Sequence, residues 1–187
     1  MKQFIITLLL CLSITVPVFS AGTSVSYTID PEKNAFAHNN MGIMYVEEKC
    51  YYAAIQEFKI AINLSPSTQA SAIFYNNLGE TYMFIGYPDM AKTCFEDAIK
   101  LYGLNFKYYL NLCECYKALK ITNTKISEFQ SSKNVYDKIK LGILYIETNQ
   151  VRKGVNLLDE LCMEEPDLMI TPAIRQYLKE IINSKRI

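Results

Sequence analysis

Histidine and cysteine are the side chains of this sequence best suited to chemistry, and they are few. The 187-residue chain has a single histidine, His38, and no tryptophan. A Ser-His-Asp or Cys-His arrangement would depend on that one imidazole, and little material remains for a metal site built from several histidines. No glycine-rich phosphate loop and no glycine-flanked serine typical of a nucleophile elbow occurs. We therefore expect no catalytic residue, no cofactor and no metal ion, although scattered Glu and Tyr side chains leave catalysis open.

The cysteines after residue 20 are odd in number, and their spacing matches no zinc-ligand pattern: Cys50, Cys94, Cys113, Cys115 and Cys162. Cys113 and Cys115 are two residues apart on a predicted helix, so their side chains point to different faces and cannot easily bond. Free cysteine is among the most buried residue types. We expect buried thiols, and at most two disulfides as the alternative.

Composition restricts the class of protein. The chain has 19 Lys+Arg against 19 Asp+Glu, whereas nucleic-acid binders normally carry a basic excess, so we expect no nucleic-acid partner. Hydrophobic residues make up 50% and charged residues 20%, which excludes a disordered polyelectrolyte. Only seven glycines and six prolines are present, which favours long helices over a turn-rich β fold.

Residues 1–20 have the order of a secretory signal peptide, with Lys2 before an apolar stretch over 4–19 and a cleavage site between Ser20 and Ala21. A helix over this apolar stretch is about 24 Å long, shorter than a bilayer core of about 30 Å. We expect an exported protein, periplasmic or extracellular. The alternative is an uncleaved segment that anchors the protein to the membrane. Residues 21–34 mix Gly, Ser, Thr and Pro, which predicts a flexible segment.

A short motif recurs four times along the chain: a large apolar residue, a small residue, two variable residues and a tyrosine. The small residues are Gly42, Gly79, Cys113 and Gly142, at intervals of 37, 34 and 29. A second cluster, A-x3-F-x2-A, follows Gly42 and Gly79 at identical distances, and a related cluster follows Gly142. Both spacings mark one face of an α-helix, and small residues that face large rings allow two antiparallel helices to approach closely.

This pattern resembles the tetratricopeptide repeat, a helix–turn–helix unit of 34 residues. The resemblance implies an all-α fold, a right-handed α-solenoid. Its repeat array spans 35–171, with four repeats at 35–68, 72–105, 106–134 and 135–168. His38 occupies an aromatic packing position of the first repeat, so we expect it to pack rather than to catalyse. The third repeat is short and has Lys125 and Ser132 at its small-residue positions, which predicts a short second helix around Asn123–Ser131.

Repeat proteins need a terminal helix with a polar outer face to cover the last apolar surface. An apolar stripe at helical spacing runs through residues 173–182, and Thr171-Pro172 before it suits the start of a helix. The sequence therefore predicts a capping helix over 172–184.

Carrying the family's concave surface over to this chain assigns four residues of each first helix to a groove. These are Phe36, Asn39, Ile43 and Val46; Ile73, Asn76, Glu80 and Met83; Lys107, Leu110, Glu114 and Lys117; and Tyr136, Ile139, Ile143 and Ile146. An exposed apolar patch of this kind usually marks a protein or peptide site. As the alternative, the N-terminal segment covers Phe36 and Ile43, or the capping helix covers part of 136–146. Asn40, Asn77 and Asn111 stand where the family commonly has asparagine, so we expect a structural role for them.

One subgroup of the family binds the C-terminal carboxylates of heat-shock chaperones through a basic clamp. Of the residues that form this clamp, Asn77 and Lys107 are present, but most of the positive charge is missing, so we do not expect that function. The sequence predicts an exported, non-catalytic scaffold or adaptor that binds a protein or peptide in its concave groove. The alternative is a structural or assembly subunit that self-associates, or docks through its convex face or its ends.

Overall fold

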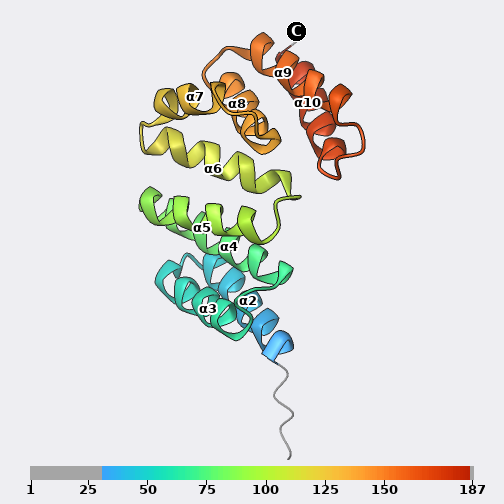
Figure 1. Ribbon diagram of the computed structural model, residues 1–187. Helices are drawn as coiled ribbons and strands as arrows, with labels where there is room; N and C mark the ends of the chain where they lie inside the picture. Colours follow the sequence, from blue (N-terminus) through green and yellow to red (C-terminus); the bar gives the residue numbers. More distant parts are fainter. Residues whose placement is uncertain (1–30, 186–187) are drawn as a thin grey trace, which may run out of the picture.

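The computed structural model of the chain describes residues 31–185. The predicted signal peptide and most of the flexible N-terminal segment lie outside the described residues. The described part forms nine helices and no strand (Figure 1). The helices are α2 (Pro31–Glu47), α3 (Tyr51–Leu64), α4 (Gln69–Phe84), α5 (Pro88–Leu101), α6 (Phe106–Ala118), α7 (Thr122–Gln130), α8 (Val135–Glu147), α9 (Val151–Glu164) and α10 (Thr171–Lys185).

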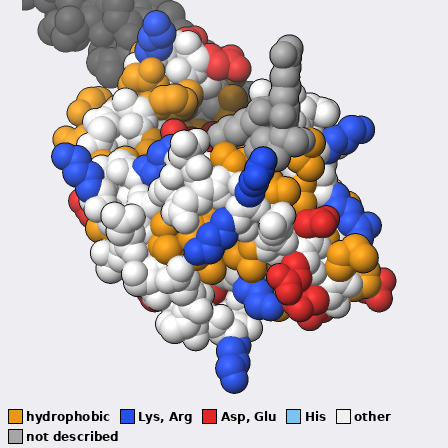
Figure 2. Space-filling model, turned by 90° about the horizontal axis from the view of Figure 1, so that it is seen from above, with side chains coloured by type: hydrophobic (Ala, Val, Ile, Leu, Met, Phe, Trp, Pro, Cys, Tyr) orange, Lys and Arg blue, Asp and Glu red, His pale blue; other side chains and the backbone are white. Residues whose placement is uncertain are grey.

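The first eight of these helices form four successive helix pairs that stack into an elongated array, and α10 follows at its C-terminal end (Figure 1). The expected all-α solenoid is confirmed. Seen along the array in Figure 2, Lys and Arg side chains are spread around the face, and apolar side chains show between them. Within 31–185, no helix combines the length and the apolar character that crossing a membrane requires.

Each helix pair closes through the same backbone turn. One residue of every turn has positive φ: Lys49 (61°), Gly86 (80°), Lys120 (59°) and Asn149 (64°). The N–H of the next residue then donates to the carbonyl of the tyrosine that ends the repeated motif, over N···O distances of 2.8 to 3.0 Å. This arrangement satisfies a carbonyl that the end of a helix leaves unpaired. The recurring tyrosine therefore fixes the turn through its backbone.

The glycines of the motif lie where the two helices of a pair cross. A Cβ atom added to Gly42 would lie 2.5 Å from the ring of Phe58, and one added to Gly79 would lie 2.6 Å from the ring of Phe95. Both rings are 1% exposed. Close approach of the helices therefore requires glycine at these positions, as the repeated spacing predicted.

The third helix pair is more open than the others. Its second helix, α7, has nine residues and lies where the sequence predicts a short helix around 123–131. α7 buries only Ile126 and Phe129, and it packs against α8 more than against α6. Lys140 of α8 lies over the Phe129 ring, with Nζ 4.5 Å from its centroid. In the irregular third repeat, the second helix α7 thus packs mainly against α8 of the next pair rather than against α6 of its own pair.

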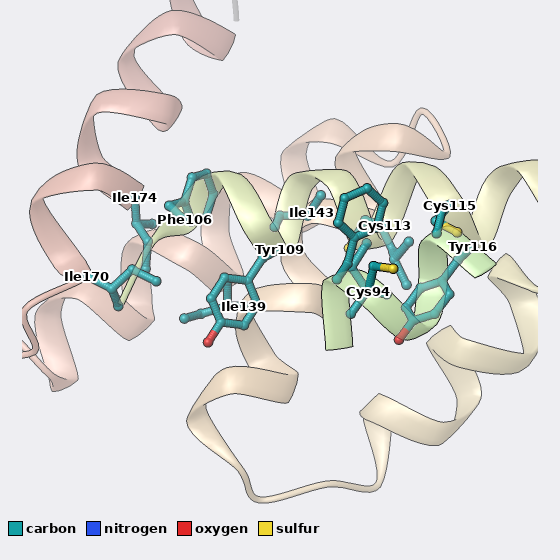
Figure 3. Packing of buried hydrophobic residues seen from close by; sticks show 14 of the residues in the cluster. Cys94, Phe106, Tyr109, Cys113, Cys115, Tyr116, Ile139, Ile143, Ile170 and Ile174 are labelled. Atoms are coloured by element: carbon teal, nitrogen blue, oxygen red, sulfur yellow. The ribbon is translucent and has the colours of Figure 1, made fainter. Parts of the chain in front are cut away.

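The last helix, α10, packs back onto the start of α6 as well as onto α9. The rings of Phe106 and Tyr177 lie 5.1 Å apart between centroids, and Ile170 and Ile174 are fully buried. Figure 3 shows Ile170 and Ile174 gathered near Phe106. On its other side, Arg175 donates to the carbonyl oxygen of Cys162 at 3.1 Å. α10 therefore closes the C-terminal end of the array.

All five cysteines of the described residues are free thiols. Cys94, Cys113, Cys115 and Cys162 are buried, which confirms the expected burial. The expectation is wrong for Cys50, which is exposed because it lies in the turn between α2 and α3. Burial raises the pKa of Cys94 to about 12 and that of Cys115 to about 11, so these thiols stay protonated at neutral pH.

Candidate partner-binding groove

The groove residues that the sequence assigns to α2, α4 and α6 lie mostly at the surface. Phe36 and Ile43 of α2 are each 39% exposed, and Ile73 of α4 is 43% exposed. Glu80 is half-buried. Val46, Met83 and Leu110 are half-buried against the core, while Lys107, Glu114 and Lys117 are exposed. These helices therefore present a mixed apolar and charged face.

The residues assigned to α8 do not belong to this open face. Ile139 and Ile143 are 0% exposed and Ile146 is 4% exposed, because they pack into the core that α10 completes. Tyr136 is half-buried and stacks on Tyr109, with ring centroids 6.1 Å apart. This corrects the extent of the predicted groove. The capping helix occupies its C-terminal end, as the alternative interpretation of the sequence had it.

Two adjoining hollows lie along α2, α4 and α6, the first helices of the first three helix pairs. The first hollow, of about 230 Å³, lies between α2 and α4 and has Ile43, Val46 and Glu47 on one wall. The second hollow, of about 390 Å³, lies between α4 and α6 and has Lys107, Asn111 and Glu114 on one wall. Glu80 and Phe84 of α4 line both hollows. The two hollows therefore form one continuous surface with α4 at its centre.

A network of polar side chains fixes the floor between the helices. Asn77 donates to Asn39 Oδ1 at 2.9 Å, and Asn111 donates to Asn76 Oδ1 at 2.8 Å, so each bond joins one first helix to the next. Asn39 and Asn76 are 4% and 3% exposed. Buried amides need such partners. Asn77 and Asn111 therefore hold successive repeats together, in the structural role expected for them, whereas Asn40 is exposed and takes no part in these bonds. Asn39 and Asn76, which the sequence assigned to the groove, are buried in this network instead.

Glu80 receives the largest share of this network. Its Oε1 atom accepts hydrogen bonds from Asn76 at 2.9 Å and from Asn111 at 2.7 Å. Lys107 Nζ lies 2.6 Å from the same oxygen. Glu80 therefore belongs to the framework of the groove, with its charge already compensated.

Phe84 is the largest exposed side chain on this surface, and the sequence did not assign it to the groove. It is 64% exposed, and its ring stacks on Tyr51 of α3 with centroids 5.9 Å apart. Phe84 lies one helical turn after Glu80, and Glu47 lies one turn after Ile43. Each also directly follows the last assigned residue of its helix, Val46 or Met83, so widening each stripe by one position would have included both.

A further hollow, of about 470 Å³, lies where α10 meets the start of α6, and Leu110 and Tyr177 are among its lining residues. Lys107 lines this hollow as well as the second one. α10 forms one wall, so this hollow is a product of the C-terminal cap. It extends the groove surface past Lys107.

His38 links the two helices of the first pair. Its Nδ1 atom lies 2.6 Å from Glu57 Oε2, which joins α2 to α3 within the first helix pair. Its side chain is 31% exposed, and that of Glu57 is 17% exposed. The ring thus ties the two helices together where an aromatic packing residue was expected.

Residues 72–103 match the tetratricopeptide repeat family. No curated protein matches the sequence. Similar solved structures include a tetratricopeptide repeat protein from Parabacteroides merdae, with 14% identity over 81% of this chain and 61% of that chain and a TM-score of 0.51. They also include the MamA protein, with 16% identity over 81% of this chain and 89% of that chain and a TM-score of 0.50.

Pseudomonas aeruginosa pilF is similar as well, with 12% identity over 83% of this chain and 71% of that chain and a TM-score of 0.50. At such identities the likeness concerns the fold. The repeated helix pairs, the glycines at their crossings and these similar structures all indicate the same fold. The described residues form an all-α solenoid of the tetratricopeptide-repeat type, and residues 72–103 match that family directly.

Proposed function

We propose that this chain is an exported, non-catalytic scaffold that binds a segment of another protein on the concave face of α2, α4 and α6. The observation that carries the proposal is the pair of adjoining hollows that share the exposed Phe84 ring. Large exposed aromatic residues beside a concave surface are typical anchors for a protein partner. An extended segment that crosses both hollows would cover this ring.

The framework beneath the surface supports this function. The Asn39–Asn77 and Asn76–Asn111 hydrogen bonds fix the spacing of the three helices before any partner arrives. A rigid groove binds with a smaller loss of conformational entropy than a flexible one. The site therefore suits recognition by shape, with no reacting group required.

Truncating Phe84 tests the proposal. Partner proteins are captured by crosslinking in the native compartment, and each is then quantified against Phe84→Ala and against Tyr52→Ala. Tyr52 of α3 is 71% exposed and lines neither hollow, so it is the matched aromatic control. We expect Phe84→Ala to weaken capture by roughly 30-fold, the effect of removing an interface anchor worth about 2 kcal/mol.

The helical circular-dichroism signal of both variants should stay unchanged. Capture that survives Phe84→Ala and is lost with Tyr52→Ala would move the site to the surface of α3 that carries Tyr52. Capture that neither substitution alters would remove the concave face from the proposal.

Export is part of the proposal, and it rests on the order of residues 1–20. Mass spectrometry of the protein recovered from the periplasm or the medium should give a chain that begins at Ala21. A chain that keeps residues 1–20 and sediments with the membrane would favour the anchored alternative.

One observation favours the second candidate, a subunit that self-associates through its end. On α2, Met41 and Met44 are 41% and 58% exposed. Their counterparts in the next repeat, Leu78 and Thr81, are 4% and 1% exposed because the preceding helix pair covers them. Within residues 31–185, the first helix of the array thus presents an apolar strip that no other element covers.

Sedimentation of the purified chain distinguishes the two candidates. A dimer that Met44→Lys converts to a monomer would support association of two copies through this strip. A monomer at all concentrations would leave the groove as the proposed site.

A further inference from the structure

We propose that the partner segment is cationic as well as apolar, with a Lys or Arg side chain in each hollow on either side of an apolar residue that covers Phe84. This inference rests on the function proposed above and adds the chemistry of the partner. Four charged residues line the two hollows: Glu47, Glu80, Lys107 and Glu114. Three carboxylates against one ammonium group give the surface a negative character.

Only part of this negative charge is compensated inside the protein. Lys107 Nζ lies 2.6 Å from Glu80 Oε1, so these two charges form a pair at the centre of the groove. Glu80 also accepts two amide hydrogen bonds at the same oxygen. The negative charge that remains for a partner therefore lies on Glu47 in the first hollow and on Glu114 in the second.

The side-chain carboxylates of Glu47 and Glu114 have no ion pair or hydrogen bond with any other residue in 31–185. Lys117, one turn after Glu114 on α6, pairs with Glu147 of α8 instead. Glu47 is the last residue of α2, where the helix dipole disfavours a negative charge. Neither carboxylate stabilises its own helix through a visible contact, which leaves both free to receive a partner's cation.

Phe84 lies between the two carboxylates, since it lines both hollows. Its stacking on Tyr51 holds one side of the ring, and 64% of the side chain stays exposed. The stems of Lys and Arg cover apolar surface while their charged heads reach toward carboxylates, and the heads are also attracted to ring faces. A segment with both basic and apolar residues can therefore cover the Phe84 ring and pair with both carboxylates at once.

Charge also disfavours the other occupants. An acidic segment would bring its carboxylates to Glu47 and Glu114, which costs binding free energy. Residues 21–30 of this chain contain no Lys or Arg and include Asp30, so they do not supply the cations. A separate basic-apolar segment fits better than either.

Three synthetic peptides test the inference by fluorescence anisotropy against the purified chain. Each peptide is about twelve residues long and has the same apolar framework. The two positions that flank a central Phe are both Lys in the first peptide, both Gln in the second and both Glu in the third. We expect the Lys peptide to bind about tenfold more tightly than the Gln peptide, and the Glu peptide to bind most weakly. Raising the salt concentration should narrow these differences, because it screens exposed charges.

The carboxylates are then removed singly. Glu47→Gln and Glu114→Gln should each weaken the Lys peptide about two- to fivefold, as expected for an exposed ion pair, and leave the Gln peptide unchanged. Glu160→Gln on α9 makes the same change of net charge at an exposed residue outside both hollows, so it is the matched control.

Equal binding of the Lys and Gln peptides, both weakened by Phe84→Ala, would overturn the inference and leave the proposed groove intact. The inference would also be overturned if Glu160→Gln lowered the preference for the Lys peptide as much as Glu47→Gln and Glu114→Gln do. The preference would then reflect only the net charge of the protein. If no peptide binds, or Phe84→Ala changes nothing, the proposed function and the inference fail together.

Discussion

At the scale of single residues, the contact between Gly79 and Phe95 decides how closely α4 and α5 approach. A methyl group added at Gly79 would meet the Phe95 ring at 2.6 Å, and that ring is 1% exposed. Overpacking of this kind typically costs about 1–3 kcal/mol. We expect Gly79→Ala to lower the free energy of unfolding by that amount in urea denaturation.

The double variant Gly79→Ala/Phe95→Ala provides the check on this contact. Because the ring that clashes is gone, the loss should be smaller than the sum of the two single losses. Additive losses would show that the crossing of α4 and α5 does not depend on this pair.

Burial also determines which thiols of the protein react. The thiolate is the reactive form of cysteine, and burial raises the pKa of Cys94 to about 12. Titration with a thiol reagent at pH 8 should detect one fast group, Cys50, in the chain that begins at Ala21. Denaturant should expose all five groups of the described residues.

Cys50→Ser should abolish the fast phase of the titration and leave four groups in denaturant. Fewer than five groups in the unreduced, denatured chain would instead mean that export introduces a disulfide. A fast phase that survives Cys50→Ser would show that the core opens at one of the buried thiols.

At the scale of elements, α10 illustrates how a terminal helix completes a repeat array. Ile174 lies on the buried face of α10 and is 0% exposed, whereas Ile182, two turns later in the same helix, is 39% exposed. Truncation of a buried isoleucine costs about 2–5 kcal/mol. We expect Ile174→Ala to lower the free energy of unfolding within this range, and Ile182→Ala to change it by less than about 1 kcal/mol.

Both variants make the same chemical change in one helix, so their difference reports burial alone. Equal and small effects in urea denaturation would mean that α10 leaves the array readily. The residues assigned to α8 would then become available to a partner.

The helix pairs could be predicted from the sequence, because glycine, tyrosine and phenylalanine stand at the same distances from one another in the first two repeats, although the repeats themselves differ in length. The shared role of Phe84 could not, since it depends on the side chain's exposure and on its stacking with Tyr51. The direction in which α10 packs could not be predicted from the sequence either. Its apolar stripe predicts burial, but only the contact of Tyr177 with Phe106 shows that α10 turns toward the start of α6.

At the scale of the whole molecule, the two ends of the array differ. α10 covers the C-terminal end, whereas no element within 31–185 covers Met41 and Met44 of the first helix pair. In a repeat array each unit is stabilised by its neighbours, so a unit with one neighbour opens more easily than a unit with two. Among the described helices, the pair α2–α3 has α4 as its only large neighbour, whereas α8–α9 contacts α6, α7 and α10.

We therefore predict that the array frays from its N-terminal end. Hydrogen exchange followed by mass spectrometry should show faster exchange in α2 and α3 than in α8 and α9, with α4 and α5 protected at least as well as α8 and α9. Ile174→Ala should narrow the difference, because it weakens the capped end. Slower exchange in α2 and α3 than in α8 and α9 would contradict the prediction. Since Ile43 and Glu47 lie on the fraying pair, a bound partner should slow exchange there first.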